Sequence, residues 1–119
     1  MKSSGWADEI DCAITVCDTN GIILYMNDKA LRQFKNDGGA ELIGKSLYEC
    51  HPKEAGDKIR KLIEEKKSNT YTIEKNGIKK LIRQEPWYNE GGICGLVEFS
   101  FVLPAEVPHF VRSQILAGK

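Results

Sequence analysis

Residues 13–27 read Ala-Ile-Thr-Val-Cys-Asp-Thr-Asn-Gly-Ile-Ile-Leu-Tyr-Met-Asn, and the rest of the chain is organised around them. Two short apolar runs, residues 13–17 and 22–26, flank a polar turn sequence. Gly21 can adopt a positive φ without a steric clash, and the Asp18 carboxylate can accept hydrogen bonds from the amides of the turn. The pattern therefore predicts a tight β-hairpin.

The composition indicates one domain of ordinary size. The chain has 119 residues, 41% of them hydrophobic, which is enough for a packed core. Its 17 Lys and Arg residues balance its 17 Asp and Glu residues, so no net charge favours nucleic acid or an anionic membrane. No run approaches the ~20 apolar residues of a membrane span, and the first residues contain no apolar leader. We expect a cytoplasmic protein with no nucleic-acid partner and no membrane partner.

The four cysteines, Cys12, Cys17, Cys50 and Cys94, lack the spacing of a metal or redox motif. Without an export signal, reduced thiols are expected rather than disulfides. Folding could bring Cys12, Cys17, Cys50 and His51 together as a zinc site, but no spacing in the sequence points to one. No metal is therefore expected.

Helical patterns follow the predicted hairpin. Asn27 ends the second strand and can cap a helix. Residues 28–36 predict that helix, because their apolar residues recur at helical spacing. One or two further helical turns are predicted over residues 40–47. The clearest helix runs from about residue 52 to residue 67. Its apolar residues form one stripe: Ala55, Ile59, Leu62 and Ile63.

The remaining sequence predicts strands. Residues 70–75, 78–88 and 93–103 are rich in β-branched, aromatic and apolar residues, and Asn76-Gly77 marks a hairpin between the first two of these segments. The element order β-β-α-α-α-β-β-β describes an α+β domain, in which helices cover one face of a five-stranded antiparallel sheet. A small-molecule pocket can form between that face and the helices.

The chain divides into an N-terminal lead (residues 1–11), a folded domain (residues 12–103) and a C-terminal extension (residues 104–119). Trp6 and Ile10 lie four residues apart in the lead, as on one face of a helix. The alternative is a frayed terminus that Trp6 anchors.

Several short motifs, in their order and spacing, resemble a PAS domain over roughly residues 10–103. The resemblance implies a sensory or protein-interaction module with sheet order 2-1-5-4-3, which is often dimeric. The matching motifs are Asp18-Thr19-Asn20-Gly21, Tyr25-Met26-Asn27 before a helix, Leu42-Ile43-Gly44-Lys45-Ser46-Leu47, and Gly91 followed by Gly95-Leu96-Val97-Glu98.

The resemblance also bears on cofactors. Cys50-His51-Pro52 before the long helix is similar to a variant in some bacterial PAS sensors, and the chain resembles a single-domain sensor of that kind. Light sensors of this family that bind flavin have a reactive cysteine where this chain has Leu47, so flavin is not expected. Members that bind haem carry an axial histidine on the long helix. His51 lies just before that helix, so haem bound by His51 is only a second alternative.

Cys50 beside His51 also suggests a thiolate nucleophile activated by an imidazole. No third residue that would orient the pair is evident, and adjacent residues seldom point their side chains at each other. We instead expect Cys50 to pack under the long helix and His51 to help cap it. No enzymatic activity is expected.

The resemblance and the alternation of side chains along strands assign residues to the pocket. The last strand is expected to turn Val97, Phe99 and Phe101 inward, and the preceding strand Ile82 and Gln84. Gln84 either orients a ligand through its amide or bonds to a neighbouring backbone group or a buried water. The candidate pocket residues are Cys17, Leu31, Phe34, Leu47, Cys50, His51, Ile59, Ile63, Ile82, Gln84, Val97 and Phe99.

Two functions remain open beside the haem alternative. The first is a sensory module that binds a small ligand and signals to a partner that the sequence does not identify. The second is an interaction module with a filled core that acts by dimerisation. A homodimer is expected, because a PAS sheet carries helices on one face and leaves apolar surface on the other. The candidate interface residues are Trp6, Ile10, Leu81, Trp87 and Leu96.

Overall fold

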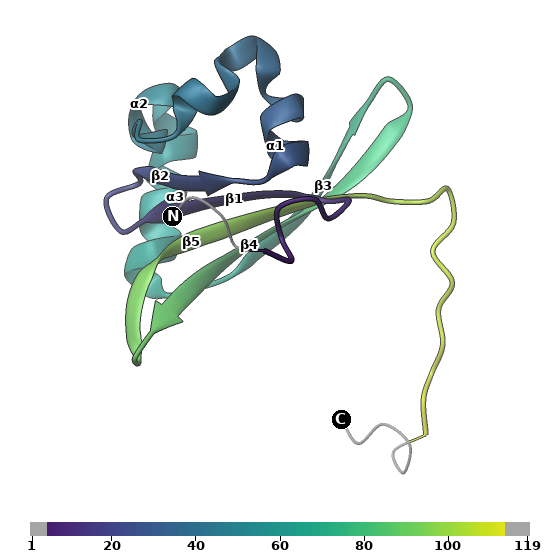
Figure 1. The fold of residues 1–119 in the computed structure, drawn as a ribbon. Coiled ribbons are helices and arrows are strands. Elements are labelled where there is room, and N and C mark those ends of the chain that lie inside the picture. The colour runs from purple at the N-terminus through teal and green to yellow at the C-terminus, as the bar shows by residue number, and fades with distance from the viewer. Residues whose placement is uncertain (1–4, 114–119) are drawn as a thin grey trace.

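The computed structural model describes residues 5–113 and contains the predicted five-stranded antiparallel sheet. The strand order is β2-β1-β5-β4-β3, so the first and last strands of the domain lie side by side in the middle of the sheet (Figure 1). The strands are β1 (Ala13–Asp18), β2 (Ile23–Met26), β3 (Asn69–Lys75), β4 (Ile78–Asn89) and β5 (Gly92–Val102).

The predicted first hairpin is present and its turn is built as expected. One carboxylate oxygen of Asp18 accepts hydrogen bonds of 2.9 Å from the backbone amides of Asn20 and Ile22. Gly21 has a φ of 78°, which glycine adopts without a Cβ clash. Hydrogen bonds within the turn thus close β1 onto β2, and the Leu47 amide adds one to the Gly21 carbonyl oxygen from outside it.

The helices lie on one side of the sheet and are shorter than the sequence patterns suggest (Figure 1). The predicted helix at 28–36 ends at residue 33, where Phe34 leaves helical geometry with φ −105° and ψ 23°. It is followed by 3₁₀ turns, the first of which ends at Gly38 with a φ of 123°. The long helix begins one residue after Pro52 and ends at Glu65, and Lys66 caps it in the left-handed conformation. The helical elements are α1 (Asp28–Gln33), η1 (Lys35–Asp37), η2 (Gly39–Leu42), α2 (Leu47–Cys50) and α3 (Lys53–Glu65).

Two apolar clusters join the helices to the inner face of the sheet. In the first, Cys17 and Leu96 pack against Ile59, Leu62 and Ile63 of the α3 stripe. In the second, the residues are Ala13, Ile23, Met26 and Ala30, with Leu31, Phe34, Leu42 and Leu47 packed around them. The inner face is therefore the one that carries the helices and any pocket beneath them.

Asn27 connects the hairpin, the first helix and the lead. Its side chain is 1% exposed, and its Oδ1 accepts hydrogen bonds of 3.0 Å from the backbone amides of Ile14 and Ala30. Its Nδ2 donates to the carbonyl oxygens of Ala7 and Cys12. The helix cap expected at Asn27 is present, and the same side chain also secures the lead.

The lead covers part of the outer face of the sheet, and it does so without a helix. Ala7 is 3% exposed, whereas Trp6 is 73% and Ile10 43% exposed, so neither alternative for the lead, a helical face or an anchor at Trp6, is found in this structure. Ala7 and Cys12 pack with other buried side chains of the outer face. These are Ile14, Val16 and Tyr25, with Trp87, Val97 and Phe99 half-buried around them.

The inward assignment of Val97 and Phe99 is also wrong. Paired residues on neighbouring strands share a face, and the register pairs Glu98 with both Gln84 and Thr15, and Leu96 with Cys17. The even-numbered residues of β5 therefore face the helices. Val97, Phe99 and Phe101 face the other way, where Phe99 and Phe101 stack with ring centroids 6.2 Å apart.

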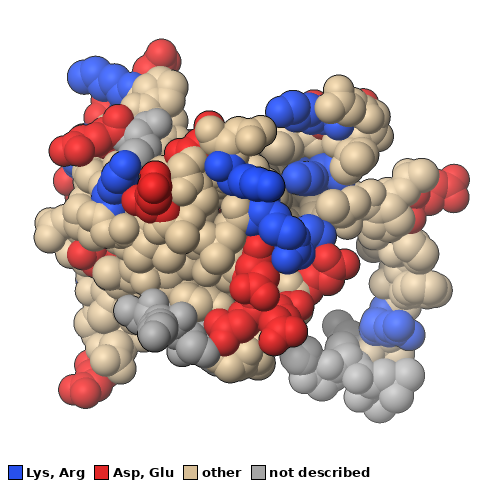
Figure 2. Space-filling view, turned by 45° about the horizontal axis from the view of Figure 1, so that its top comes forward, with Lys and Arg blue, Asp and Glu red and all other residues tan. Residues whose placement is uncertain are grey.

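The C-terminal extension shows no helix over residues 104–113, and its last residues lie outside the described part of the chain. Charges of both signs lie on the visible face of the molecule, where a group of Lys and Arg near the middle adjoins a group of Asp and Glu (Figure 2). No helix within residues 5–113 combines the length and apolar character needed to cross a bilayer.

Candidate functional site

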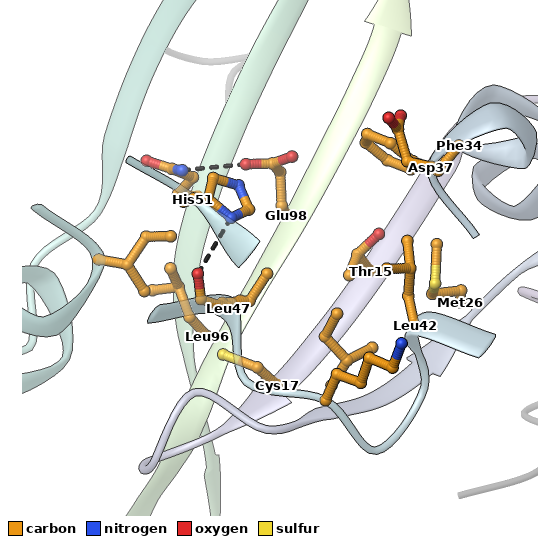
Figure 3. Close-up of a pocket in the computed structure, with 14 residues that line it drawn as sticks. Thr15, Cys17, Met26, Phe34, Asp37, Leu42, Leu47, His51, Leu96 and Glu98 are labelled. Atoms are coloured by element: carbon orange, nitrogen blue, oxygen red, sulfur yellow. Dashed lines mark hydrogen bonds between the residues drawn. The ribbon is translucent and has the colours of Figure 1, made fainter. Parts of the chain in front are cut away.

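A cavity of about 520 Å³ lies between the inner face of the sheet and the helices. Its walls are largely apolar and include Ile23 and Met26 of β2, Phe34 after α1, and Leu42 of η2 (Figure 3). A cavity of this size is within the range of about 300–1,000 Å³ typical of sites for drug-sized ligands. The fold therefore has room for a small molecule beside its packed core.

A row of polar side chains crosses the sheet at the floor of this cavity. The backbone register aligns Thr15, Glu98, Gln84 and Asn69 on β1, β5, β4 and β3. Asn69 Nδ2 donates a 2.9 Å hydrogen bond to Gln84 Oε1, and Gln84 Nε2 donates one of 2.9 Å to Glu98 Oε1 (Figure 3 shows the second). Gln84 is 6% exposed, and neighbouring side chains thus bond to both the oxygen and the nitrogen of its side-chain amide. Of the two roles expected for Gln84, the structure shows bonding to neighbours, which are the side chains of Asn69 and Glu98.

Polar groups also stand around the cavity, at Asp37, Lys45 and His51. Asp37 and Lys45 are exposed and carry opposite charges. His51 Nδ1 donates a hydrogen bond of 3.1 Å to the carbonyl oxygen of Leu47, and its backbone amide donates to the same oxygen. His51 therefore caps the C-terminus of α2, whereas the sequence suggested a cap for the long helix.

The thiol of Cys17 is part of the cavity wall and is 2% exposed. Burial raises the pKa of Cys17 to about 11, because a thiolate loses its hydration in an apolar site. Cys17 is therefore a neutral, apolar contact at physiological pH, with little nucleophilic character.

The structure does not bring the zinc ligands considered above together. Cys17 faces the helices, whereas Cys12 belongs to the cluster on the outer face of the sheet. The Cys50 side chain lies outside what the structure describes. Among the residues that are described, no group of three or more His, Cys, Asp or Glu side chains could hold a metal ion.

Of the twelve candidate pocket residues, the cavity brings together Cys17, Phe34, Leu47, His51, Ile59 and Gln84. Leu31, Ile63 and Ile82 are core residues beside the cavity, and Val97 and Phe99 belong to the outer face. Eight further residues line the cavity without having been predicted from the sequence. These are Thr15, Ile23, Met26, Asp37, Leu42, Lys45, Leu96 and Glu98.

Some of the missed residues had a usable signal. Thr15 is two residues from Cys17 on one strand and shares its face. Glu98 is identified once β5 is paired with β4, because it lies opposite Gln84. Asp37 and Lys45 had no such signal, because they lie in irregular segments between helices.

The five candidate interface residues occupy different surfaces. Trp6 and Ile10 are exposed on the lead, at 73% and 43%. Leu81 and Trp87 are half-buried on the outer face. Leu96 is 4% exposed and lines the cavity, so its assignment to an outer interface is wrong, for the same reason of register as Val97 and Phe99.

Comparison with known proteins identifies a family. A family model described as the PAS fold matches residues 7–95. The comparison with curated proteins found no match. The matched range covers the last part of the lead, the helices and the sheet as far as Gly95 in β5, so it includes most of the cavity wall.

Solved structures share this fold. The PAS domain of the histidine kinase ThkA is 23% identical with a TM-score of 0.63, and the match covers 77% of this chain and 99% of that domain. Vibrio cholerae VqmA, described as bound to DPO, is 18% identical with a TM-score of 0.65, over 82% of this chain and 54% of VqmA. The Vibrio cholerae Aer2 receptor, described as a dual PAS-heme oxygen sensor, is 17% identical with a TM-score of 0.58, over 78% of this chain and 95% of that structure. At these identities the likeness shows the fold alone.

Proposed function

The chain belongs to the PAS-fold family, and on that premise we propose that it is a cytoplasmic sensory module that binds a small molecule between its sheet and its helices. The observation that carries this proposal is the cavity of about 520 Å³, with apolar walls and a polar row on its floor. Two similar structures are described as bound to DPO and as a PAS-heme oxygen sensor, which supports a receptor role for this fold.

Three further features support the details of this proposal. Cys12, Cys17 and Cys94 are free thiols, as expected in a reducing compartment. The raised pKa of Cys17 argues against a nucleophilic role for its thiol, and the capping bond engages one ring nitrogen of His51, the residue that the sequence suggested as an activator of Cys50, so the module is proposed to act without catalysis. The signal would then pass to a separate partner by a change in the helices or the lead.

Native mass spectrometry of the full chain tests ligand binding. The protein, purified without added ligand, is expected to carry a non-covalent small mass or to take up compounds from a fragment library. Leu42→Trp places a large side chain in the cavity wall and should abolish that uptake. Val107→Trp, on a residue 61% exposed in the C-terminal extension, is the matched control and should bind like the parent. A folded parent that neither carries a small mass nor takes up any fragment would contradict the proposal.

The haem alternative receives less support from the geometry. His51 is exposed, and its ring is held by the Leu47 carbonyl oxygen at the end of α2. An axial ligand must instead aim a ring nitrogen at the iron. The purified protein is therefore expected to show no Soret band. Stoichiometric haem that the parent retains and His51→Ala loses would reverse this assignment.

Self-association is proposed as a second property, because the outer face of the sheet leaves aromatic surface uncovered. Phe101 is 40% exposed and stacks on Phe99 there, and Trp6 projects from the lead that covers the neighbouring part of the face. A two-fold dimer would cover this surface. The sequence also suggested an interaction module with a filled core that acts by dimerisation. The cavity argues against a completely filled core.

A further inference from the structure

We propose that the molecule bound in this cavity is a small cation, with an apolar body and an ammonium, amidinium or protonated ring nitrogen that pairs with Glu98. The inference rests on the proposed function, because it names the class of ligand for the same cavity. It comes from the polar row on the floor and from the charges around the mouth.

The hydrogen bonds along the row have a fixed direction. Asn69 Nδ2 donates to Gln84 Oε1, which leaves Gln84 Nε2 to donate to Glu98 Oε1. This order suits an ionised Glu98, because a carboxylate only accepts hydrogen bonds. The row therefore places one neutral donor on the carboxylate, from Gln84, which is 6% exposed and bonded on its other side to Asn69.

Within the described part of the chain, the charge of Glu98 has no cationic partner. None of the ion pairs among residues 5–113 includes Glu98. A carboxylate can accept about four hydrogen bonds, and Glu98 is half-buried at the floor of an apolar cavity. An anion in such a place is stabilised most by a cation that also donates hydrogen bonds. A bound cation would supply both.

The other charged groups around the cavity do not reverse this preference. Lys45 could attract an anion, but it is exposed to solvent, and Asp37, which is also exposed, carries the opposite charge. Solvent and salt screen such exposed charges. The Glu98 carboxylate on the floor is less exposed than the side chains of Lys45 and Asp37. Its charge is therefore screened less and has the larger effect on whether the cavity binds a cation or an anion.

The remaining lining defines the body of the ligand. Met26, the register partner of Thr15 on β2, provides an aliphatic contact beside the polar row, and Phe34 and Leu42 provide aromatic and aliphatic contacts from the helical side. Figure 3 shows Thr15, Met26 and Leu42 grouped on one side of Glu98, with Leu47, Leu96 and Cys17 below it. A ring or a short alkyl chain fits this lining, while its charged end lies against Glu98.

The test uses probes matched in shape and different in charge. Benzamidine is compared with benzamide, and phenethylamine with 2-phenylethanol and 3-phenylpropionate, by following backbone amide signals of the full chain in NMR titrations. The variant is Glu98→Gln, which keeps the size of the side chain and an acceptor for Gln84. The control is Glu74→Gln, on an exposed residue of β3.

We expect each cation to bind the parent about tenfold more tightly than its neutral partner, which corresponds to about 1.4 kcal/mol. The signals of Thr15 and Leu96 should move. Glu98→Gln should remove the preference while neutral probes still bind, and Glu74→Gln should behave like the parent.

Each contrary outcome has a distinct meaning. Equal binding of cations and neutral probes by the parent overturns the ligand class, as does tighter binding of 3-phenylpropionate, whether or not Glu98→Gln folds. A preference for cations that persists in a folded Glu98→Gln overturns the assignment to Glu98. If no probe of any charge moves the cavity signals of the folded parent, the proposed function itself fails.

Discussion

The indole nitrogen of Trp87 donates a 2.9 Å hydrogen bond to the carbonyl oxygen of Cys17, across the strand that separates them. Gly95 of β5 is the register partner of Trp87 and lies beneath this contact. A Cβ atom built on Gly95 would stand 1.9 Å from the same Cys17 oxygen, and Gly95 has a φ of +149°. The close approach of β4, β5 and β1 beside the cavity thus depends on the absence of a Cβ atom at Gly95.

Gly95→Ala is therefore expected to be strongly destabilising, because the new methyl group must push β5 away from β1. We expect the free energy of unfolding to fall by more than about 3 kcal/mol in chemical denaturation. Gly92→Ala, in the same strand, meets its nearest atom at an ordinary 3.7 Å and serves as the control. Equal stability of the two variants would show that the strands can separate there without cost.

The buried hydrogen bonds of Asn27 predict a second sensitive position. Asn27→Ala would leave the buried amides of Ile14 and Ala30 without their acceptor. Each unpaired group costs about 1–3 kcal/mol, so a loss of about 3 kcal/mol is expected in equilibrium unfolding. Asn36→Ala, at an exposed position, should change stability by no more than about 0.5 kcal/mol. A parent-like Asn27→Ala would mean that water replaces these bonds.

The α3 stripe can be tested with a charge. Ile59 is 6% exposed and packs with Cys17 and Leu96, so Ile59→Asp places an unpaired carboxylate in the core. A loss of several kcal/mol, on the order of 3–5, is expected in urea denaturation, although a raised pKa of the new carboxyl group would limit it. Lys58→Asp on the exposed side of α3 is the control. If Ile59→Asp and Lys58→Asp were equally stable, α3 would not pack over the sheet.

The thiol of Cys17 predicts a dependence on pH. Burial raises its pKa from 9.0 to about 11, so the folded protein keeps a proton that the unfolded chain loses. This contribution to stability is complete below pH 9 and is lost as the pH rises from 9 towards 11, by at most about 1.4 kcal/mol per pH unit. Urea titrations of the parent should therefore show a steeper fall in this range than those of Cys17→Ala. Parallel curves for the two proteins would contradict the burial effect.

The proposed dimer predicts concentration-dependent sedimentation. Trp6 is 73% exposed on the lead, and its removal by Trp6→Ala should weaken self-association without loss of folding. Arg32→Ala, at an exposed position on α1, is the control and should associate like the parent. A parent that is monomeric at high micromolar concentration would exclude the dimer. A dimer that Trp6→Ala leaves unchanged would exclude only the role of the lead.

Local chemistry decided much of the fold, and the sequence by itself was enough to predict it. Asp18 and Gly21 specify the first turn, and the stripe through Ile59 and Ile63 specifies the long helix, because each signal depends on residues only a few positions apart. The order of these elements was sufficient to predict the five-stranded sheet and its strand order through the resemblance to PAS domains.

The tertiary structure alone decided which face each strand turns to the cavity. Alternation along β5 is equally compatible with Val97 and Phe99 or with Leu96 and Glu98 facing inward, since a shift of one residue exchanges the two faces. Pairing with Gln84 selects Glu98, and this pairing depends on residues 14 positions away. The anionic floor of the cavity is therefore a property of the strand register, because its four polar residues come from four strands and form a row only in the assembled sheet.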